Sequence, residues 1–227
     1  MSSYENAGDL SLAVSITNVF FTLATFGIRT FQVSDINNKY SSSSYVTTRI
    51  VTGCVSFVLC MGFVLLNRDY SLEQMLCIVI YMVFRLSEAL VDVCQAIQQK
   101  AYRMDYIAKS CVMRGVLLLG SFSGVLYLTQ SLVTAISVMS VSTMSVVLFY
   151  DLRVACRLAP FRLHIRLQDL KSILLECWPL MLTSMLMTSI VSIPRYILEL
   201  LHSNEVLGFY SSVATPAVIV QIGRAHV

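Results

Sequence analysis

A stripe of polar side chains interrupts an otherwise apolar run near the middle of the sequence. Its members are Arg85, Glu88, Asp92, Gln95 and Gln99. Intervals of three and four residues place all five on one face of a helix. Each ionisable group inside a bilayer costs at least about 2.5 kcal/mol on insertion scales, which argues against three of them facing lipid. We therefore expect the stripe to face protein or a water-filled cavity.

Two interpretations of this stripe remain open. In the structural one, Arg85 pairs with Glu88 one turn away and so makes insertion tolerable. In the functional one, the stripe lines a transport cavity, where Arg85 holds an anionic ligand or Glu88 and Asp92 carry a proton or Na⁺. The structural pair explains Arg85 and Glu88 but gives no reason for Asp92 and the two glutamines.

A second polar cluster follows Pro194 and contains Arg195, Glu199 and His202. Proline removes a backbone hydrogen bond, so we expect the helix to kink or end there, and broken helices often mark transporter sites. The simpler alternative is an ordinary helix end, with Arg195 and Tyr196 at the membrane interface.

The composition indicates that membrane helices carry both clusters. The chain has 227 residues, of which 56% are hydrophobic and 13% charged. A soluble domain carries roughly twice that share of charge. The apolar runs are continuous, whereas the strands of a membrane β-barrel would alternate. We therefore predict an all-α, polytopic membrane helix bundle. The net charge of +3 is too small to suggest nucleic acid as a partner.

The apolar runs predict about seven transmembrane helices, each long enough for a hydrocarbon core of about 30 Å. They cover residues 10–28, 50–66, 72 to about 97, 115–150 divided in two by a turn at 129–131, 177–193, and a run that begins near 206.

The basic residues of the connecting segments predict the orientation. Segments 29–49, 95–114 and 151–171 carry three, four and five Lys or Arg, whereas the connections between them carry at most one. By the positive-inside rule, these three basic segments face the cytoplasm. The N-terminus, which has Glu5 and Asp9 but no basic residue, then faces outward.

Both ends of the chain lead us to expect a fragment. An outward N-terminus without a signal peptide is simply explained if a preceding helix is missing. At the other end, residues 222–227 (IGRAHV) interrupt an apolar run and look like a translated sequencing adapter.

The sequence shows no arrangement of catalytic or metal-binding residues. It has no GxSxG, HExxH or P-loop motif, its three histidines are dispersed, and its seven cysteines stand singly. We predict no enzyme activity, no catalytic residue, no metal site and no cofactor.

Three segments carry a resemblance to a known family. They are residues 26–35 (FGIRTFQVSD), 98–110 (QQKAYRMDYIAKS), and 194–199 (PRYILE) followed by 207–211 (LGFYS). In this order they resemble the polysaccharide (O-antigen) flippases of the multidrug/oligosaccharidyl-lipid/polysaccharide exporter superfamily. The resemblance covers roughly residues 5–221.

The resemblance implies a larger architecture. Family members have about twelve to fourteen helices in two lobes around a central cavity, so the family's first helix would be absent here. Residues 1–150 would form most of the N-terminal lobe, 151–171 a cytoplasmic linker, and 172–221 the start of the C-terminal lobe.

The resemblance also implies an activity. Such a protein moves a polyprenyl-pyrophosphate-linked oligosaccharide across the bacterial plasma membrane for surface polysaccharide biosynthesis. Arg29, Arg85 and Arg195 are candidates by position for binding the pyrophosphate in the cavity, where Glu88, Asp92 and Gln95 would also lie. Membrane lipid is an expected partner, and H⁺ or Na⁺ a possible coupling ion.

Two alternative functions remain open for the sequence. A cation-coupled multidrug exporter of the same superfamily would use Glu88 or Asp92 for coupling, whereas Arg85 favours the flippase. A membrane-embedded polysaccharide polymerase would need a long polar outer loop, and the outer loops here are short.

Overall fold

The protein is described by a computed structural model that covers residues 3–66, 70–160, 166–201, 206, 208–210 and 213. These residues form helices and no strand, which confirms the predicted all-α membrane bundle. The elements in chain order are α1 (Ser3–Thr25), α2 (Ile28–Ser34), α3 (Ser42–Leu66), α4 (Leu72–Lys100), α5 (Met104–Thr129), α6 (Leu132–Val146), the π-helical segment η1 (Val147–Asp151), α7 (Leu152–Leu158) and α8 (Leu167–Leu201).

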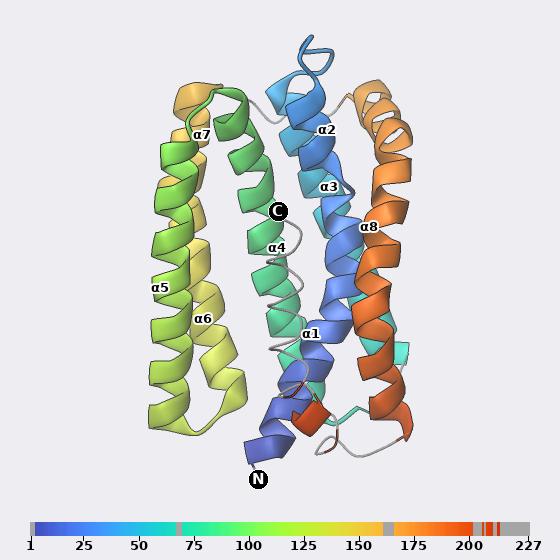
Figure 1. Ribbon diagram of the computed structural model, residues 1–227, viewed down its shortest axis with the longest axis vertical. Helices are drawn as coiled ribbons and strands as arrows, with labels where there is room; N and C mark the ends of the chain where they lie inside the picture. Colours follow the sequence, from blue (N-terminus) through green and yellow to red (C-terminus); the bar gives the residue numbers. More distant parts are fainter. Residues whose placement is uncertain are drawn as a thin grey trace.

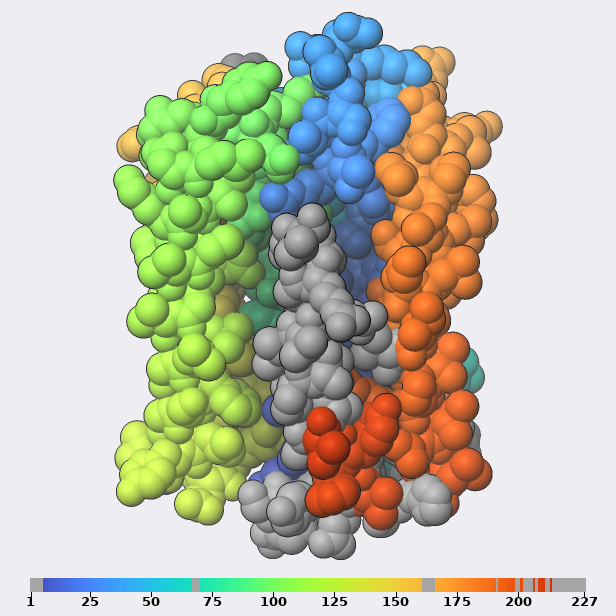
Figure 2. All heavy atoms as spheres, viewed as in Figure 1, coloured from blue at the N-terminus to red at the C-terminus, as the bar shows by residue number. Residues whose placement is uncertain are grey.

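Helix α4 occupies the centre of the bundle (Figure 1). It packs against α1 and α3 on one side and against α6 on the other. Helix α1 also packs along α8, and α5 pairs with α6. In the space-filling view, α5 and α8 form the two flanks of the molecule (Figure 2). The helix that carries the polar stripe is thus surrounded by neighbouring helices.

Five segments are long and apolar enough to cross a membrane within the part of the chain that the structure describes. They are Asn6–Ser34, Ser42–Leu66, Met104–Thr129, Leu132–Leu158 and Leu167–Ile190. Helix α4 has 29 residues, long enough to span, but it is not among these five, and it carries the charged residues Arg85, Glu88 and Asp92. Neighbouring helices rather than lipid must solvate those charges.

The predicted turn at residues 129–131 is confirmed. Helix α5 ends at Thr129 and α6 begins at Leu132. Gln130 adopts a left-handed conformation (φ 54°), and its N–H donates to the Leu126 carbonyl. The long uncharged stretch is therefore two antiparallel helices with a two-residue connection.

The three basic segments are shorter as loops than the sequence predicted. Helix α3 already begins at Ser42, and α4 and α5 are separated by residues 101–103 alone. Leu152–Leu158, in the third segment, is also helical. The prediction of loops at 29–49, 95–114 and 151–171 was thus wrong in extent, because residues beside the apolar runs continue the helices.

Helix α8 runs without interruption from Leu167 to Leu201 and contains both Pro179 and Pro194. Of the two expectations for Pro194, a kink or an end of the helix, the end was therefore wrong. Membrane helices tolerate proline where neighbouring groups satisfy the freed backbone. The predicted span that begins near residue 206 lies largely outside the described residues, as do residues 222–227.

A sharp backbone change separates α1 from α2. Phe26 and Gly27 both have positive φ, at 47° and 65°. A Cβ at Gly27 would lie 2.7 Å from the Leu180 Cβ of α8, so only glycine fits this position. The break redirects the chain into α2, which begins at Ile28 and carries Arg29.

Candidate functional site

The five stripe residues lie on a single helix, as their spacing predicted. A capping box starts this helix: Ser71 Oγ accepts the Gln74 N–H at 3.2 Å, and Gln74 Oε1 accepts the Ser71 N–H at 3.0 Å. Such a reciprocal cap fixes the first turn. The same five residues, Arg85, Glu88, Asp92, Gln95 and Gln99, are called the α4 stripe below.

Two arginines hold Asp92. Arg29 Nη1 of α2 lies 3.3 Å from Asp92 Oδ1, and Arg49 Nη2 of α3 lies 2.6 Å from Asp92 Oδ2. Arg29 also donates to Gln95 Oε1 at 3.0 Å and to Gln99 Oε1 at 3.3 Å. The three stripe residues that an Arg85–Glu88 pair left unexplained are therefore all partners of Arg29.

Arg49 is 1% exposed, and its role was not predicted because its position in the sequence indicated a loop. Its Nη1 donates to the Ala24 carbonyl at 3.0 Å, and the Thr52 hydroxyl donates to the same oxygen at 2.8 Å. Ala24 belongs to the last turn of α1, whose carbonyls lack helical partners. Arg49 thus fastens the end of α1 to α4.

Two arginines also hold Glu88. Arg85 Nη1 lies 2.6 Å from Glu88 Oε2, so the predicted pairing one turn apart is present. Arg114 Nη2 of α5 lies 3.3 Å from Glu88 Oε1. Arg114 was predicted to lie in a cytoplasmic loop, but it is helical and 15% exposed.

Arg85 has further partners in α1. Its Nη2 donates to the Asn18 side-chain oxygen. Its guanidinium lies 5.0 Å from the centre of the Phe21 ring and 5.4 Å from that of Tyr81. Aromatic faces attract a guanidinium, most strongly where water is excluded. Arg85 is therefore held in place between α1 and α4.

The two clusters together carry an excess of positive charge. Four guanidiniums, those of Arg29, Arg49, Arg85 and Arg114, contact two carboxylates. Two positive charges remain uncompensated among these six groups. Arg29, Arg85 and Arg114 keep side-chain exposures of 35%, 17% and 15%. The α4 stripe and its partners can therefore accept an anion.

Arg195 does not join this arrangement. It lies on α8 and, among the described side chains, forms no ion pair. Its neighbour Tyr196 lines a separate apolar hollow of about 320 Å³ between α1, α3 and α8. The other residues that line this hollow are Ser15, Ile16, Val19, Phe20, Phe63, Ser192 and Ile193.

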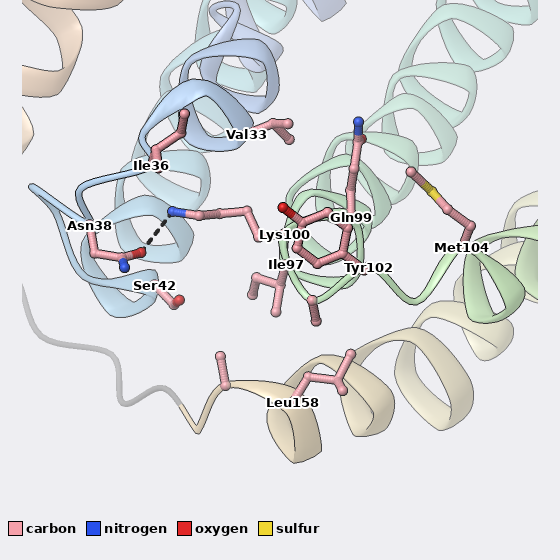
Figure 3. A pocket seen from close by; sticks show the side chains of 12 residues that line it. Val33, Ile36, Asn38, Ser42, Ile97, Gln99, Lys100, Tyr102, Met104 and Leu158 are labelled. Atoms are coloured by element: carbon pink, nitrogen blue, oxygen red, sulfur yellow. Dashed lines mark hydrogen bonds between the residues drawn. The ribbon is translucent and has the colours of Figure 1, made fainter.

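A second hollow, of about 570 Å³, opens at the end of the bundle where α4 ends (Figure 3). Gln99 of the α4 stripe, Lys100 and Tyr102 line it at the end of α4, Asn38 lines it from the connection between α2 and α3, and Leu158 from α7. Lys100 Nζ donates to Asn38 Oδ1 at 2.9 Å. The polar stripe thus continues to this end of the molecule.

Asp35 organises the connection between α2 and α3 at the same end. Its carboxylate accepts the Lys39 N–H and the Tyr45 hydroxyl, each at 2.9 Å, and the Tyr40 N–H at 3.3 Å. Partial burial acts to raise the pKa of Asp35, but these bonds and the charge of Lys100 outweigh it and hold the pKa below its ordinary value. The anionic form of Asp35 therefore stabilises the connection.

The fold and the site together define the class of this protein. Several apolar, membrane-length helices that enclose a polar helix are typical of a multi-pass integral membrane protein. The chain belongs to the polysaccharide biosynthesis protein family, whose model matches residues 3–225, and this is the family of O-antigen flippases of the multidrug/oligosaccharidyl-lipid/polysaccharide exporter superfamily. No curated protein and no solved structure matches the chain. The protein is thus a membrane protein of polysaccharide biosynthesis.

Proposed function

We propose that this protein is a transporter, not an enzyme, that moves a polyprenyl-pyrophosphate-linked oligosaccharide across the bacterial plasma membrane. The transported oligosaccharide would serve surface polysaccharide biosynthesis, with O-antigen of lipopolysaccharide as the expected glycan class. The observation that carries the proposal is the excess of guanidinium groups over carboxylates along the α4 stripe. The family membership supports the same class of substrate.

The chemistry of the substrate matches these groups. A pyrophosphate diester carries two negative charges, and the planar fork of arginine pairs with phosphate through two parallel hydrogen bonds. Arg29, Arg85 and Arg114 are partly exposed, so their guanidiniums can exchange a carboxylate partner for a phosphate. Arg49 is enclosed and keeps a structural role. Glu88 and Asp92 hold the arginines in place while no substrate is bound.

A cation-coupled drug exporter fits the same residues less well. Such a protein would present Glu88 or Asp92 to a cation. Each carboxylate already lies between two guanidiniums, at 2.6 and 3.3 Å in both cases. Positive charge at this distance repels a cationic ligand. The arrangement therefore favours an anionic substrate.

The test is surface glycan display in a strain that lacks its own copy of the gene. Complementation with Arg85→Ala or Arg29→Ala should lower display about 10- to 100-fold, because a charge-assisted hydrogen bond contributes roughly 1.5–3 kcal/mol. Lipid-linked oligosaccharide should accumulate inside the cell. The protein level in the membrane fraction, measured in parallel, separates lost transport from lost protein.

Arg103→Ala is the matched control. Arg103 is also an arginine paired with a carboxylate, at 2.9 Å from Asp105, but both side chains are nearly half exposed and lie outside the α4 stripe. Display should be unchanged in this variant. Normal display by both Arg85→Ala and Arg29→Ala would refute the proposed site.

A further inference from the structure

A buried carboxylate lies outside the α4 stripe. Asp151 is the last residue of η1, the π-helical segment through which α6 continues into α7. Its side chain is fully buried, and neither carboxylate oxygen has a hydrogen-bond partner. It lies within the membrane-length segment Leu132–Leu158, about 10 Å from its end at 1.5 Å per residue. A single ionised group in this position would be strongly unfavourable.

Few groups near Asp151 can compensate its charge. The Ser110 hydroxyl of α5 lies beside the carboxylate, and Ser110 is itself fully buried. The charged group whose field reaches Asp151 is Arg114 of α5, one turn beyond Ser110. The other titratable neighbours are Cys94 of α4 and Tyr150 on η1 itself, and neither is a cation.

Arg114, the one cation that acts on Asp151 within the described part of the chain, already pairs with another carboxylate. Arg114 Nη2 pairs with Glu88 at 3.3 Å, and Arg114 Nε has no hydrogen-bond partner. One guanidinium therefore lies within electrostatic reach of two carboxylates but forms an ion pair with one of them. When Asp151 is ionised, it competes with Glu88 for Arg114, and when it is neutral, it does not.

The backbone at Asp151 supports a functional role. The Leu152 N–H donates to the Val147 carbonyl, so the helix is widened by one residue at this point. Single π-helical turns inside α-helices occur frequently at functional sites. Here the widened turn places a carboxylate inside the bundle next to α4 and α5.

We propose that Asp151 is a proton-binding site whose carboxyl group is protonated in this conformation and controls whether Arg114 stays paired with Glu88. Release of the proton to water leaves a carboxylate, which draws Arg114 away from Glu88 and so changes the charge that the α4 stripe offers to an anion. Proton binding by Asp151 is independent of the substrate. Its effect on transport rests on the proposed function.

Infrared spectroscopy of the purified protein in lipid nanodiscs tests the protonation. With ¹³C-labelled aspartate, the wild type should show the C=O stretch of a protonated aspartic acid at pH 7. Among the described aspartates, the carboxylates of Asp35, Asp92, Asp105 and Asp169 accept hydrogen bonds from protein groups. The Asp9 carboxylate accepts one from Gln74. Absence of the labelled band at pH 7 would overturn the proposal, and this measurement needs no variant.

Two variants assign the band. Asp151→Asn should remove it, and Asp105→Asn, which changes an exposed carboxylate paired with Arg103, should leave it in place. A band that persists in Asp151→Asn would also overturn the proposal. In cells, Asp151→Asn should lower glycan display at least tenfold, whereas Asp105→Asn should not. Loss of the band with normal display would confirm the proton site and refute its role in transport.

Discussion

The guanidinium of Arg49 on α3 lies 2.6 Å from the carboxylate of Asp92 on α4, and the arginine side chain is wholly enclosed. This ion pair joins two helices that are adjacent in the bundle. Because Arg49 also binds the Ala24 carbonyl at 3.0 Å, it connects α1, α3 and α4 at one point.

Replacing Arg49 with methionine should destabilise the protein by about 3 kcal/mol, because loss of one partner of a buried pair leaves the other charge uncompensated. This loss of stability lies at the lower end of the range for broken buried ion pairs, because Asp92 remains paired with Arg29. Unfolding by denaturant in mild detergent measures it. In the double variant Arg49→Met/Asp92→Asn, the loss in the free energy of unfolding should be smaller than the sum of the losses in the two single variants. Full additivity would show that the pair does not contribute as a unit.

Gly27→Ala should destabilise the protein by at least about 1 kcal/mol, the cost of a left-handed conformation for a residue with a Cβ. Contact with the Leu180 Cβ at 2.7 Å adds to this cost. Gly120→Ala is the matched control, because nothing lies within 4 Å of its Cβ position and α5 is helical there. That variant should be stabilised by roughly 0.5–1 kcal/mol. Equal effects in the two variants would contradict the close approach of α8 to the α1–α2 break.

The α4 stripe was predictable because its signal is local. Charges at three- and four-residue intervals define one face of a helix wherever that helix packs, and the Arg85–Glu88 pair follows from the same spacing. The turn at Gln130 was also predictable, since an uncharged stretch of that length exceeds one bilayer crossing.

Arg49 and Arg114 were not predictable in the same way. Each lies at the edge of an apolar run, where hydropathy and the positive-inside rule both assign a loop. Only the carboxylates of Asp92 and Glu88, supplied by another helix, make these arginines tolerable inside the bundle. Likewise, the continuity of α8 through Pro194 depends on packing that the sequence does not display.

Asp35→Asn should destabilise the α2–α3 connection at neutral pH, because the charge that accepts the Lys39 N–H and the Tyr45 hydroxyl is lost. The folded pKa of Asp35 is lowered, so its contribution is present above the ordinary value of about 3.9 and is lost as the pH falls through the folded pKa. Denaturant unfolding at intervals from about pH 7 to pH 3 should show the variant and the wild type converging in acid.

The exposed neighbour Asn37 supplies the control for this measurement. Asn37→Ala should follow the wild type throughout the pH series. A difference between wild type and Asp35→Asn that stays constant into acid would mean that the Asp35 charge is not its cause.

The orientation of the bundle is testable at two exposed positions that lie at opposite ends, Asn37 between α2 and α3 and Thr129 at the end of α5. Single cysteines at these positions are placed in a variant without the native cysteines, of which Cys54, Cys111 and Cys156 are exposed. Ser44 would be a poor choice, because it is buried and donates to Asp169 at 2.7 Å.

An impermeant thiol reagent should label Thr129→Cys in intact cells and Asn37→Cys only after permeabilisation, because the basic connections are expected to face the cytoplasm. Labelling after permeabilisation also shows that both thiols are reactive. The expected result places Asp92 and Gln99 in the cytoplasmic half of α4, with Arg29 of α2 beside them. A lipid-linked pyrophosphate made inside the cell would first meet the stripe there. The reverse labelling pattern would put those residues on the outer side, and the stripe would then face the substrate at its release rather than at its entry.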